Sequence, residues 1–220
     1  EDLPGTRAGS ASSGYYKEQS GRFWRTMDGY VGYKYRETED GLLQNRKWYT
    51  GGSVEFDCQV RTSFYAEEGP YRPVDDQRGE FEDTANDDRY YSSAIDLNTR
   101  SSVFSCGAQY DWGRLGGGDY EYQSVYAWTR PVQELYLKIS YERTDSFGTF
   151  EQTVVNGSWE ITPEDSLGGR YIYYQDDFTT DEYVRLTYGR KARQGLDIFI
   201  VYDKEPYSAE QYSLKLVYSF

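Results

Sequence analysis

The chain has 220 residues, 24 Lys and Arg against 37 Asp and Glu, and a formal net charge of −13. This acidity disfavours a nucleic acid as partner, and no apolar run reaches the roughly 18 residues that a membrane-spanning helix needs. The mean hydropathy is −0.88 and aromatic residues make up 18% of the chain. Disordered chains are poor in aromatic residues, so the composition indicates a folded protein, which at this length we expect to form one domain.

Residues 1–23 are rich in Gly, Ser and charged residues and show no period of a strand or a helix. We expect a flexible periplasmic arm over 1–23 and the folded domain over 24–220. From Trp24 onward, apolar and polar residues alternate, as in a strand with one apolar and one polar side. Twelve strands are predicted, at 24–36, 43–57, 59–66, 89–98, 102–112, 119–129, 133–144, 149–161, 166–175, 181–190, 195–203 and 210–220.

The connections between these segments are of two alternating kinds. The tight ones are at 57–58, 98–101, 130–132, 162–165 and 191–194. The generally longer, Gly-rich or acidic ones are at 38–42, 67–88, 113–119, 145–148, 175–181 and 203–209. Short periplasmic turns and longer extracellular loops are typical of outer-membrane barrels. An even number of strands would place both termini in the periplasm.

The last predicted strand ends in an apolar stripe with aromatic residues at both ends, made of Tyr212, Leu214, Leu216, Tyr218 and Phe220. Its length fits a tilted strand that crosses a bilayer, roughly 9–11 residues. It resembles the closing strand of bacterial outer-membrane barrels, in which a terminal Phe belongs to the signal read by the insertion machinery. We expect these residues to form an insertion signal, and the strand to pair with the first one, near Trp24–Arg36.

These patterns predict an all-β fold, a closed antiparallel transmembrane β-barrel of about 12 strands in the outer membrane of a Gram-negative bacterium. Only closed barrels let a sheet span lipid. The alternative is a soluble barrel or sandwich, whose strands are often near 5–6 residues, shorter than most of these segments. The expected partners are outer-membrane lipid and lipopolysaccharide, the barrel-assembly machinery and another outer-membrane protein.

Four motifs in the second half of the chain carry a family resemblance, at Gly107–Gly113, Trp128–Pro131, Leu135–Glu142 and Gly195–Asp203. They are strand-and-turn patterns, and the match covers about half of the chain. The chain resembles the C-terminal barrel of a largely uncharacterised family of bacterial outer-membrane proteins. Longer members carry an N-terminal carbohydrate-binding-like β-sandwich. The resemblance implies a barrel here. This chain departs from the family in having no room for that sandwich, so we do not carry over its glycan role.

The sequence contains no histidine and two cysteines. A Ser or water nucleophile needs a base at neutral pH, and no Ser-Lys arrangement is visible, so we expect no enzymatic activity. No zinc or haem ligand set is available, and no cofactor is expected. Cys58 and Cys106 fall on strands separated by another strand, beyond the reach of a disulfide, and are expected to be unpaired.

The acidic segment 67–88 has few positive charges. Carboxylates suit Ca²⁺ or Mg²⁺, and such an ion could bridge this loop to lipopolysaccharide. The spacing matches no calcium loop, and a solvated external loop is the favoured interpretation, so no metal site is predicted.

The predicted lumen-facing residues are polar or charged: Glu55, Gln109, Glu121, Gln123, Lys138, Arg170, Arg185, Asp197 and Lys215. They either line a narrow pore or pair with one another and plug it, and inward aromatics such as Tyr136 and Phe199 favour a constricted lumen. The sequence favours a structural or accessory barrel that anchors or scaffolds a partner. The alternative is a small diffusion channel for neutral or cationic solutes. A third possibility, an enzyme on lipid or glycan, would need a close carboxylate pair.

Overall fold

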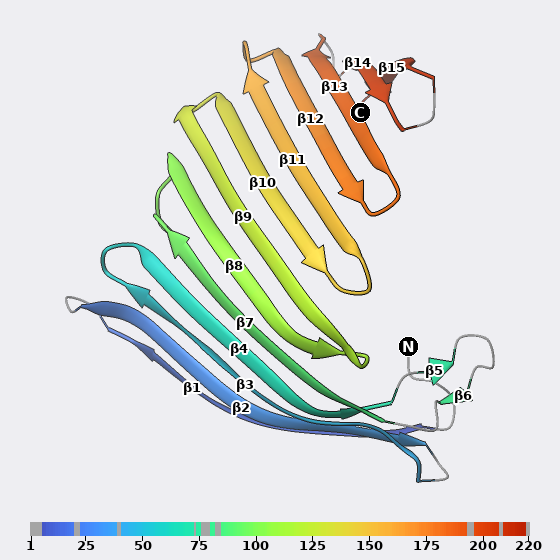
Figure 1. Cartoon of the computed structure of the whole chain (residues 1–220). Coiled ribbons are helices and arrows are strands. Elements are labelled where there is room, and N and C mark those ends of the chain that lie inside the picture. The colour runs from blue at the N-terminus through green and yellow to red at the C-terminus, as the bar shows by residue number, and fades with distance from the viewer. Residues whose placement is uncertain are drawn as a thin grey trace. The chain divides into compact units, whose positions relative to one another are not determined.

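A computed structural model describes residues 6–19, 23–38, 41–72, 74–75, 80–81, 85–192, 196–206 and 209–218. All regular structure in these residues is β-strand, and thirteen strands form one sheet in chain order (Figure 1). The strands are β1 (Thr6–Glu18), β2 (Trp24–Thr38), β3 (Leu43–Phe56), β4 (Val60–Tyr71), β7 (Asn86–Leu97), β8 (Phe104–Leu115), β9 (Gly118–Val132), β10 (Leu135–Asp145), β11 (Thr149–Glu160), β12 (Asp165–Asp176), β13 (Thr180–Lys191), β14 (Leu196–Lys204) and β15 (Gln211–Tyr218). The short strands β5 (Val74–Asp75) and β6 (Glu80–Phe81) pair separately. Within the described ranges, no helix is long and apolar enough to cross a membrane.

The all-β, antiparallel fold class is confirmed, and each of the twelve predicted segments coincides with one strand of the sheet. Neighbouring strands pair residue by residue, as along β12 and β13 from Asp165↔Arg190 to Gln175↔Thr180. Alternation with a period of two therefore located the strands correctly. The ends shift by a few residues, because backbone pairing extends past the apolar pattern.

The first strand differs from the prediction. Residues 1–23 were expected to form a flexible arm, but β1 lies within this range and all 13 of its residues pair with β2. Its middle, Gly9–Gly14, contains only Gly, Ala and Ser, so no alternation of side chains reveals it. Backbone hydrogen bonds to β2 are enough to order such a segment as a strand.

This extra strand also changes the predicted pairing of the chain ends. β2 has β1 on one side and β3 on the other, so the predicted pairing of the last strand with Trp24–Arg36 does not occur. β15 pairs with β14. Thr6 lies opposite Thr38, beside the β2–β3 connection, while Tyr218 lies opposite Leu196, beside the β13–β14 connection. The first strand therefore begins beside a connection of the longer kind, whereas the last strand ends beside a connection of the tight kind.

The sheet divides into two compact units. Unit 1 comprises Glu1–Thr99, Ala108–Gln123 and Asp145–Phe147, and unit 2 comprises Arg100–Gly107, Ser124–Thr144 and Gly148–Phe220. In each unit we call one side of the sheet the polar face. In unit 1 it carries Lys47, whose cross-strand partner is Lys34, and in unit 2 it carries Arg170 and its partner Arg185. The opposite side is the apolar face.

Neither unit has a hydrophobic core in the part of the chain that the structure describes. No hydrophobic side chain there is buried, and the buried side chains are all polar or charged: Gln44, Lys47, Ser53, Asp88, Ser105, Asp111 and Asp181. Many large hydrophobic side chains are exposed, among them Trp48, Leu186 and Ile200. This distribution is the reverse of that in a soluble protein.

Candidate functional site

A buried ion network lies at the centre of the polar face of unit 1. The Lys47 ammonium lies 3.1 Å from a carboxylate oxygen of Glu67 and 3.1 Å from one of Asp88. Lys34 contacts the other Glu67 oxygen at 2.6 Å. Lys47 is 6% exposed and Asp88 is 3% exposed. Two cations and two anions therefore balance one another. Lys47 and Asp88 lie away from bulk water, where charges require such pairing, whereas the Lys34 side chain is 39% exposed.

The backbone of β4 explains how Lys47, on β3, reaches Asp88 on β7. Gly69 lies between them, directly opposite Asp88. A Cβ at Gly69 would lie 2.1 Å from the carbonyl oxygen of Arg46 and 3.0 Å from the Cα of Lys47, and its φ is +148°. Only glycine permits this close approach, so the Lys47 side chain crosses β4 where no side chain intervenes.

A second cluster on the same face centres on Asp111, which is 3% exposed. The Tyr90 hydroxyl donates to it at 2.7 Å, and the Gln109 amide donates to it at 3.0 Å. The Tyr90 ring lies 5.9 Å from that of Tyr65 and 6.0 Å from that of Tyr120. Because the Tyr65 hydroxyl donates to Glu67 at 2.7 Å, the rings connect the two clusters.

Beyond the ion network, the polar face of unit 1 continues as hydrogen bonds. Arg61 donates to the Ser53 hydroxyl at 3.1 Å, and that hydroxyl donates to Asp28. Thr99 donates to Glu55 at 3.3 Å. Polar side chains therefore contact one another across β2, β3, β4 and β7 instead of packing an apolar layer.

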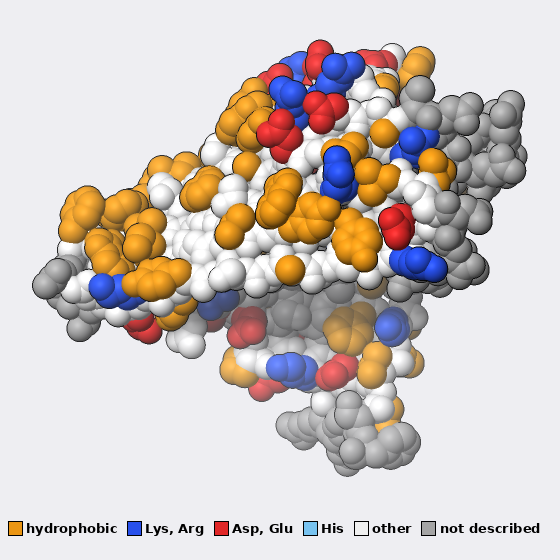
Figure 2. All heavy atoms as spheres, turned by 90° about the horizontal axis from the view of Figure 1, so that it is seen from below, with side chains coloured by type: hydrophobic (Ala, Val, Ile, Leu, Met, Phe, Trp, Pro, Cys, Tyr) orange, Lys and Arg blue, Asp and Glu red, His pale blue; other side chains and the backbone are white. Residues whose placement is uncertain are grey.

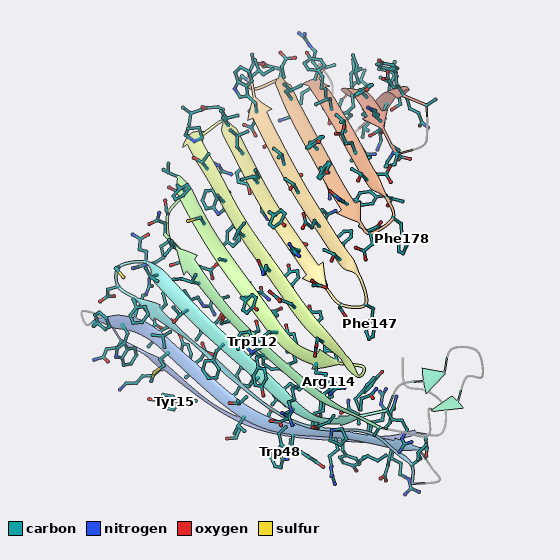
Figure 3. The ribbon with its side chains drawn as sticks, in the orientation of Figure 1. Tyr15, Trp48, Trp112, Arg114, Phe147 and Phe178 are labelled. Carbon is teal, nitrogen blue, oxygen red and sulfur yellow. The ribbon has the colours of Figure 1, made fainter. Side chains whose placement is uncertain are left out.

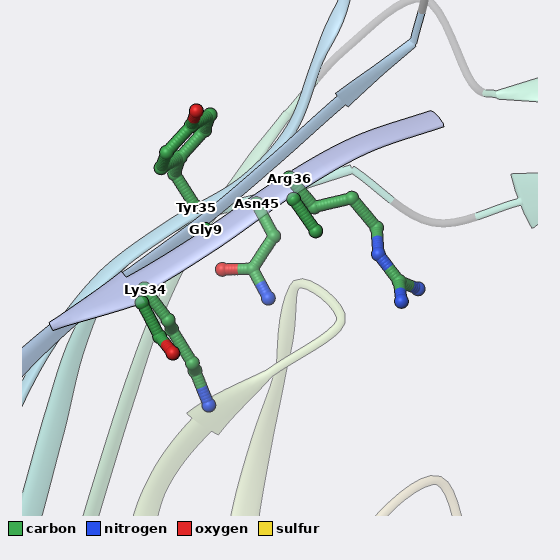
Figure 4. Close-up of a pocket in the computed structure, with 7 residues that line it drawn as sticks. Gly9, Lys34, Tyr35, Arg36 and Asn45 are labelled. Carbon is green, nitrogen blue, oxygen red and sulfur yellow. The ribbon is translucent and has the colours of Figure 1, made fainter. Parts of the chain in front are cut away.

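A hollow of about 350 Å³ opens beside this network, between β1, β2 and β3. Lys34, Arg36 and Asn45 line it from one side of the strands, whereas Tyr35 points to the other side (Figure 4). The Asn45 side-chain oxygen is buried without a hydrogen-bond partner. The small residues of β1 leave this space open to solvent.

The polar face of unit 2 holds a different arrangement. Arg185 donates to both Asp203 oxygens, at 2.6 and 3.1 Å, and lies opposite Arg170. Both arginines line a hollow of about 340 Å³ together with Asn156, Ser158 and other residues of β10–β13. Lys138 lies over the Tyr126 ring at 5.9 Å. The polar face of unit 2 therefore carries both charged and hydrogen-bonding side chains.

Seven of the nine predicted lumen-facing residues lie on polar faces. Glu55 and Gln109 belong to unit 1 and make the contacts described above. Lys138, Arg170 and Arg185 belong to unit 2, as do Asp197, which lies opposite Lys191, and Lys215, which lies opposite Phe199. These seven residues therefore share the polar face of their unit, and their position in a lumen remains a prediction.

Glu121 and Gln123 lie on the opposite face, so the predicted phase of β9 is wrong. Glu121 accepts hydrogen bonds from Tyr110 and Gln123, and Tyr110 stacks on Trp112 of the apolar face. The even-numbered residues of β9 belong to the polar face, as the contact of Tyr120 with Tyr90 shows. Both sides of β9 mix aromatic and polar residues, so hydrophobicity did not determine its phase.

The sequence missed Lys47, Glu67 and Asp88 as site residues. The segment 67–88 was predicted to be a solvated loop, but β4 continues to Tyr71 and β7 begins at Asn86. Its first and last acidic residues therefore lie in strands, where they neutralise Lys34 and Lys47. Position 47 has the phase of Glu55 in β3, which is the signal that could have identified it. Asp76, Glu82 and Asp83 lie outside the described residues.

Each unit also has an apolar face, on the side of the sheet opposite its polar face. Figure 2 shows hydrophobic side chains spread over one face of the molecule. Tyr212 is 74% exposed and Leu214 66% exposed, and Leu216 and Tyr218 are exposed beside them. These four share one side of β15 with their β14 partners, as predicted, while Phe220 lies outside the described residues. Phe147 and Phe178 project from turns at strand ends (Figure 3).

Cys58 and Cys106 are both free, as expected. Within the described ranges, no group of three or more Cys, Asp or Glu residues is placed to hold a metal ion.

The comparisons with known proteins are sparse. No family model and no curated protein sequence matches the chain. Among solved structures, the chain is similar to a KdgM porin, with 11% sequence identity and a TM-score of 0.34, over 80% of this chain and 92% of that chain. A likeness at this TM-score does not establish a shared function, so the assignment below depends on the chain's own residues.

Proposed function

We propose that the chain is an outer-membrane β-barrel whose polar faces line a passive diffusion channel for small solutes. The observation that carries this proposal is the reversed distribution of side chains. Every buried side chain in the described ranges is polar or charged, and the large hydrophobic side chains are exposed. In a closed barrel in lipid, the apolar face meets acyl chains and the polar face meets water.

The apolar face is energetically unfavourable in water. Burial of apolar surface is worth about 25 cal/mol per Å², and the rows of exposed Leu, Ile, Trp and Tyr gain nothing of this in water. A bilayer supplies the missing apolar surroundings. It also excludes open sheet edges, because unpaired backbone groups in hydrocarbon cost several kcal/mol each. The proposal therefore includes closure of the barrel.

The charges on the polar face of unit 1 favour neutral or cationic solutes. This face carries more acidic than basic side chains. The acidic ones are Glu18, Asp28, Glu55, Glu67, Asp88, Asp96 and Asp111, and the basic ones are Lys34, Arg36, Lys47 and Arg61. Rings of carboxylates favour cations in membrane pores. The net negative charge of this polar face would therefore attract cations and slow anions.

The accessory role that the sequence favoured is not supported by a specific contact surface in the described residues. We therefore propose the channel in its place. The side chains within each polar cluster are hydrogen-bonded or ion-paired with one another, and we assign them no catalytic role.

The channel proposal is tested by conductance. The protein, purified in mild detergent, is added to a planar lipid bilayer with a KCl gradient. We expect discrete conductance steps and a reversal potential shifted toward that of K⁺. The absence of steps at every voltage would overturn the channel function, and a shift toward the Cl⁻ potential would overturn the proposed selectivity.

A further inference from the structure

The turn between β8 and β9 lies against the polar face of unit 1. Its central residues, Gly116 and Gly117, have φ values of +59° and +85°, which suit a tight hairpin turn of type I′. A long loop was predicted over 113–119, but β8 ends at Leu115 and β9 begins at Gly118, so the connection is only this turn. The Arg114 side chain (Figure 3) donates a hydrogen bond to the Gly117 carbonyl at 3.1 Å, which links the end of β8 to the turn.

Two polar-face residues of β7 lie against this turn. The Gly116 amide donates to Asp88 at 2.9 Å. Gly117 lies so close to Asn86 that an added Cβ would meet the Asn86 side-chain oxygen at 3.0 Å. Asn86 and Asp88 share the polar face because each lies opposite a β4 residue of that face, Tyr71 and Gly69. The turn therefore lies over the polar side of β7.

Asp88 is the link between this turn and the ion network. One of its oxygens accepts from Gly116 and the other from Lys47, at 3.1 Å. Both acceptor sites are thus used at once, and the carboxylate is nearly inaccessible to water. A hydrogen bond to a charged acceptor is stronger than a neutral one. The position of the turn consequently depends on the charge and orientation of a single side chain.

We propose that the β8–β9 turn is a constriction element of the channel, fastened over the polar face by Asp88, and that release of this fastening widens the passage. This inference rests on the proposed channel function and adds its regulation. Lys47 holds the Asp88 carboxylate in the orientation that Gly116 needs. Loss of Asp88 frees the turn to swing away from the wall and uncovers the polar side chains beneath it.

The test combines two variants and two measurements. Asp88→Ala removes the acceptor for Gly116. In the second variant, Asn-Gly replaces residues 115–118, which shortens the hairpin by one residue pair and leaves Asp88 in place. Each is compared with the wild type for single-channel conductance in planar bilayers and for hydrogen exchange of the turn amides. Asp111→Asn, at an equally buried carboxylate that accepts hydrogen bonds from Tyr90 and Gln109, is the control for exchange.

We expect Asp88→Ala to speed exchange of the amides at 115–118 by about 10- to 100-fold, the effect of losing a hydrogen bond to a charged group. Asp111→Asn should leave their exchange at the wild-type rate. Both Asp88→Ala and the shortened hairpin should raise the conductance. If Asp88→Ala fails to fold, as a gel of unheated samples would show, the shortened hairpin decides alone.

The outcomes separate this proposal from the channel function. A wild type that conducts, with a shortened hairpin of the same conductance, would overturn the constriction and leave the channel intact. A wild type without conductance steps would overturn the channel function, and the constriction, which rests on that function, would fall with it.

Discussion

At the scale of single residues, Lys47 shows how charge is buried in a sheet that has no core. A buried ammonium costs several kcal/mol unless it is paired. Lys47 meets this requirement with two carboxylates, and Glu67 is shared with Lys34. The Lys47 ammonium also lies 5.3 Å from the centroid of the Tyr71 ring, which adds a cation–π contact. Removing Lys47 takes away the counter-charge of the buried Asp88 carboxylate, whereas Glu67 keeps Lys34.

Lys47→Met should therefore lower the free energy of unfolding by about 3–5 kcal/mol, the usual cost of breaking a buried ion pair. Urea unfolding in detergent, followed by tryptophan fluorescence, measures this loss. Lys215→Met is the matched control, because Lys215 is exposed and such surface changes usually stay within about 0.5 kcal/mol. Equal effects of the two substitutions would contradict the buried network.

At the scale of elements, β15 shows what the sequence could and could not predict. Its alternation was clear, and the structure confirms that Leu214 lies opposite Ile200 on the apolar face and Ser213 opposite Val201 on the other. β1 was missed because its small residues have no alternation. The phase of β9 failed because aromatic residues lie on its polar face.

The two sides of β15 should respond oppositely to charge. Leu214→Arg places a cation in lipid and should cost about 2–4 kcal/mol near the bilayer midplane. Ser213→Arg, one position away, faces the polar side and should cost little. The folded fraction after insertion into lipid vesicles, read from unheated gels, measures both. Equal tolerance of the two substitutions is the result expected of a protein in water, where Leu214 is already exposed.

At the scale of the whole molecule, the sequence predicted the reversed distribution of side chains but not the contacts within it. Alternation alone assigns faces, and it did so for Lys138, Arg170 and Arg185. The partners of Lys47 depend on strand register and on the gap that Gly69 leaves, and neither is visible from hydrophobicity. The acidic residues at the ends of 67–88 were predicted to be loop residues because their counter-charges lie on distant strands.

The most direct test of this account compares two tryptophans of unit 2 in lipid. Trp159 is exposed on the apolar face. Trp128 lies on the polar face, where its ring centroid is 6.1 Å from that of Tyr136. Single-tryptophan variants, with the other tryptophans changed to Phe, are inserted into vesicles of lipids brominated on their acyl chains. We predict strong quenching of Trp159 fluorescence and little quenching of Trp128. Equal quenching of the two, or none, would contradict an apolar face in contact with lipid.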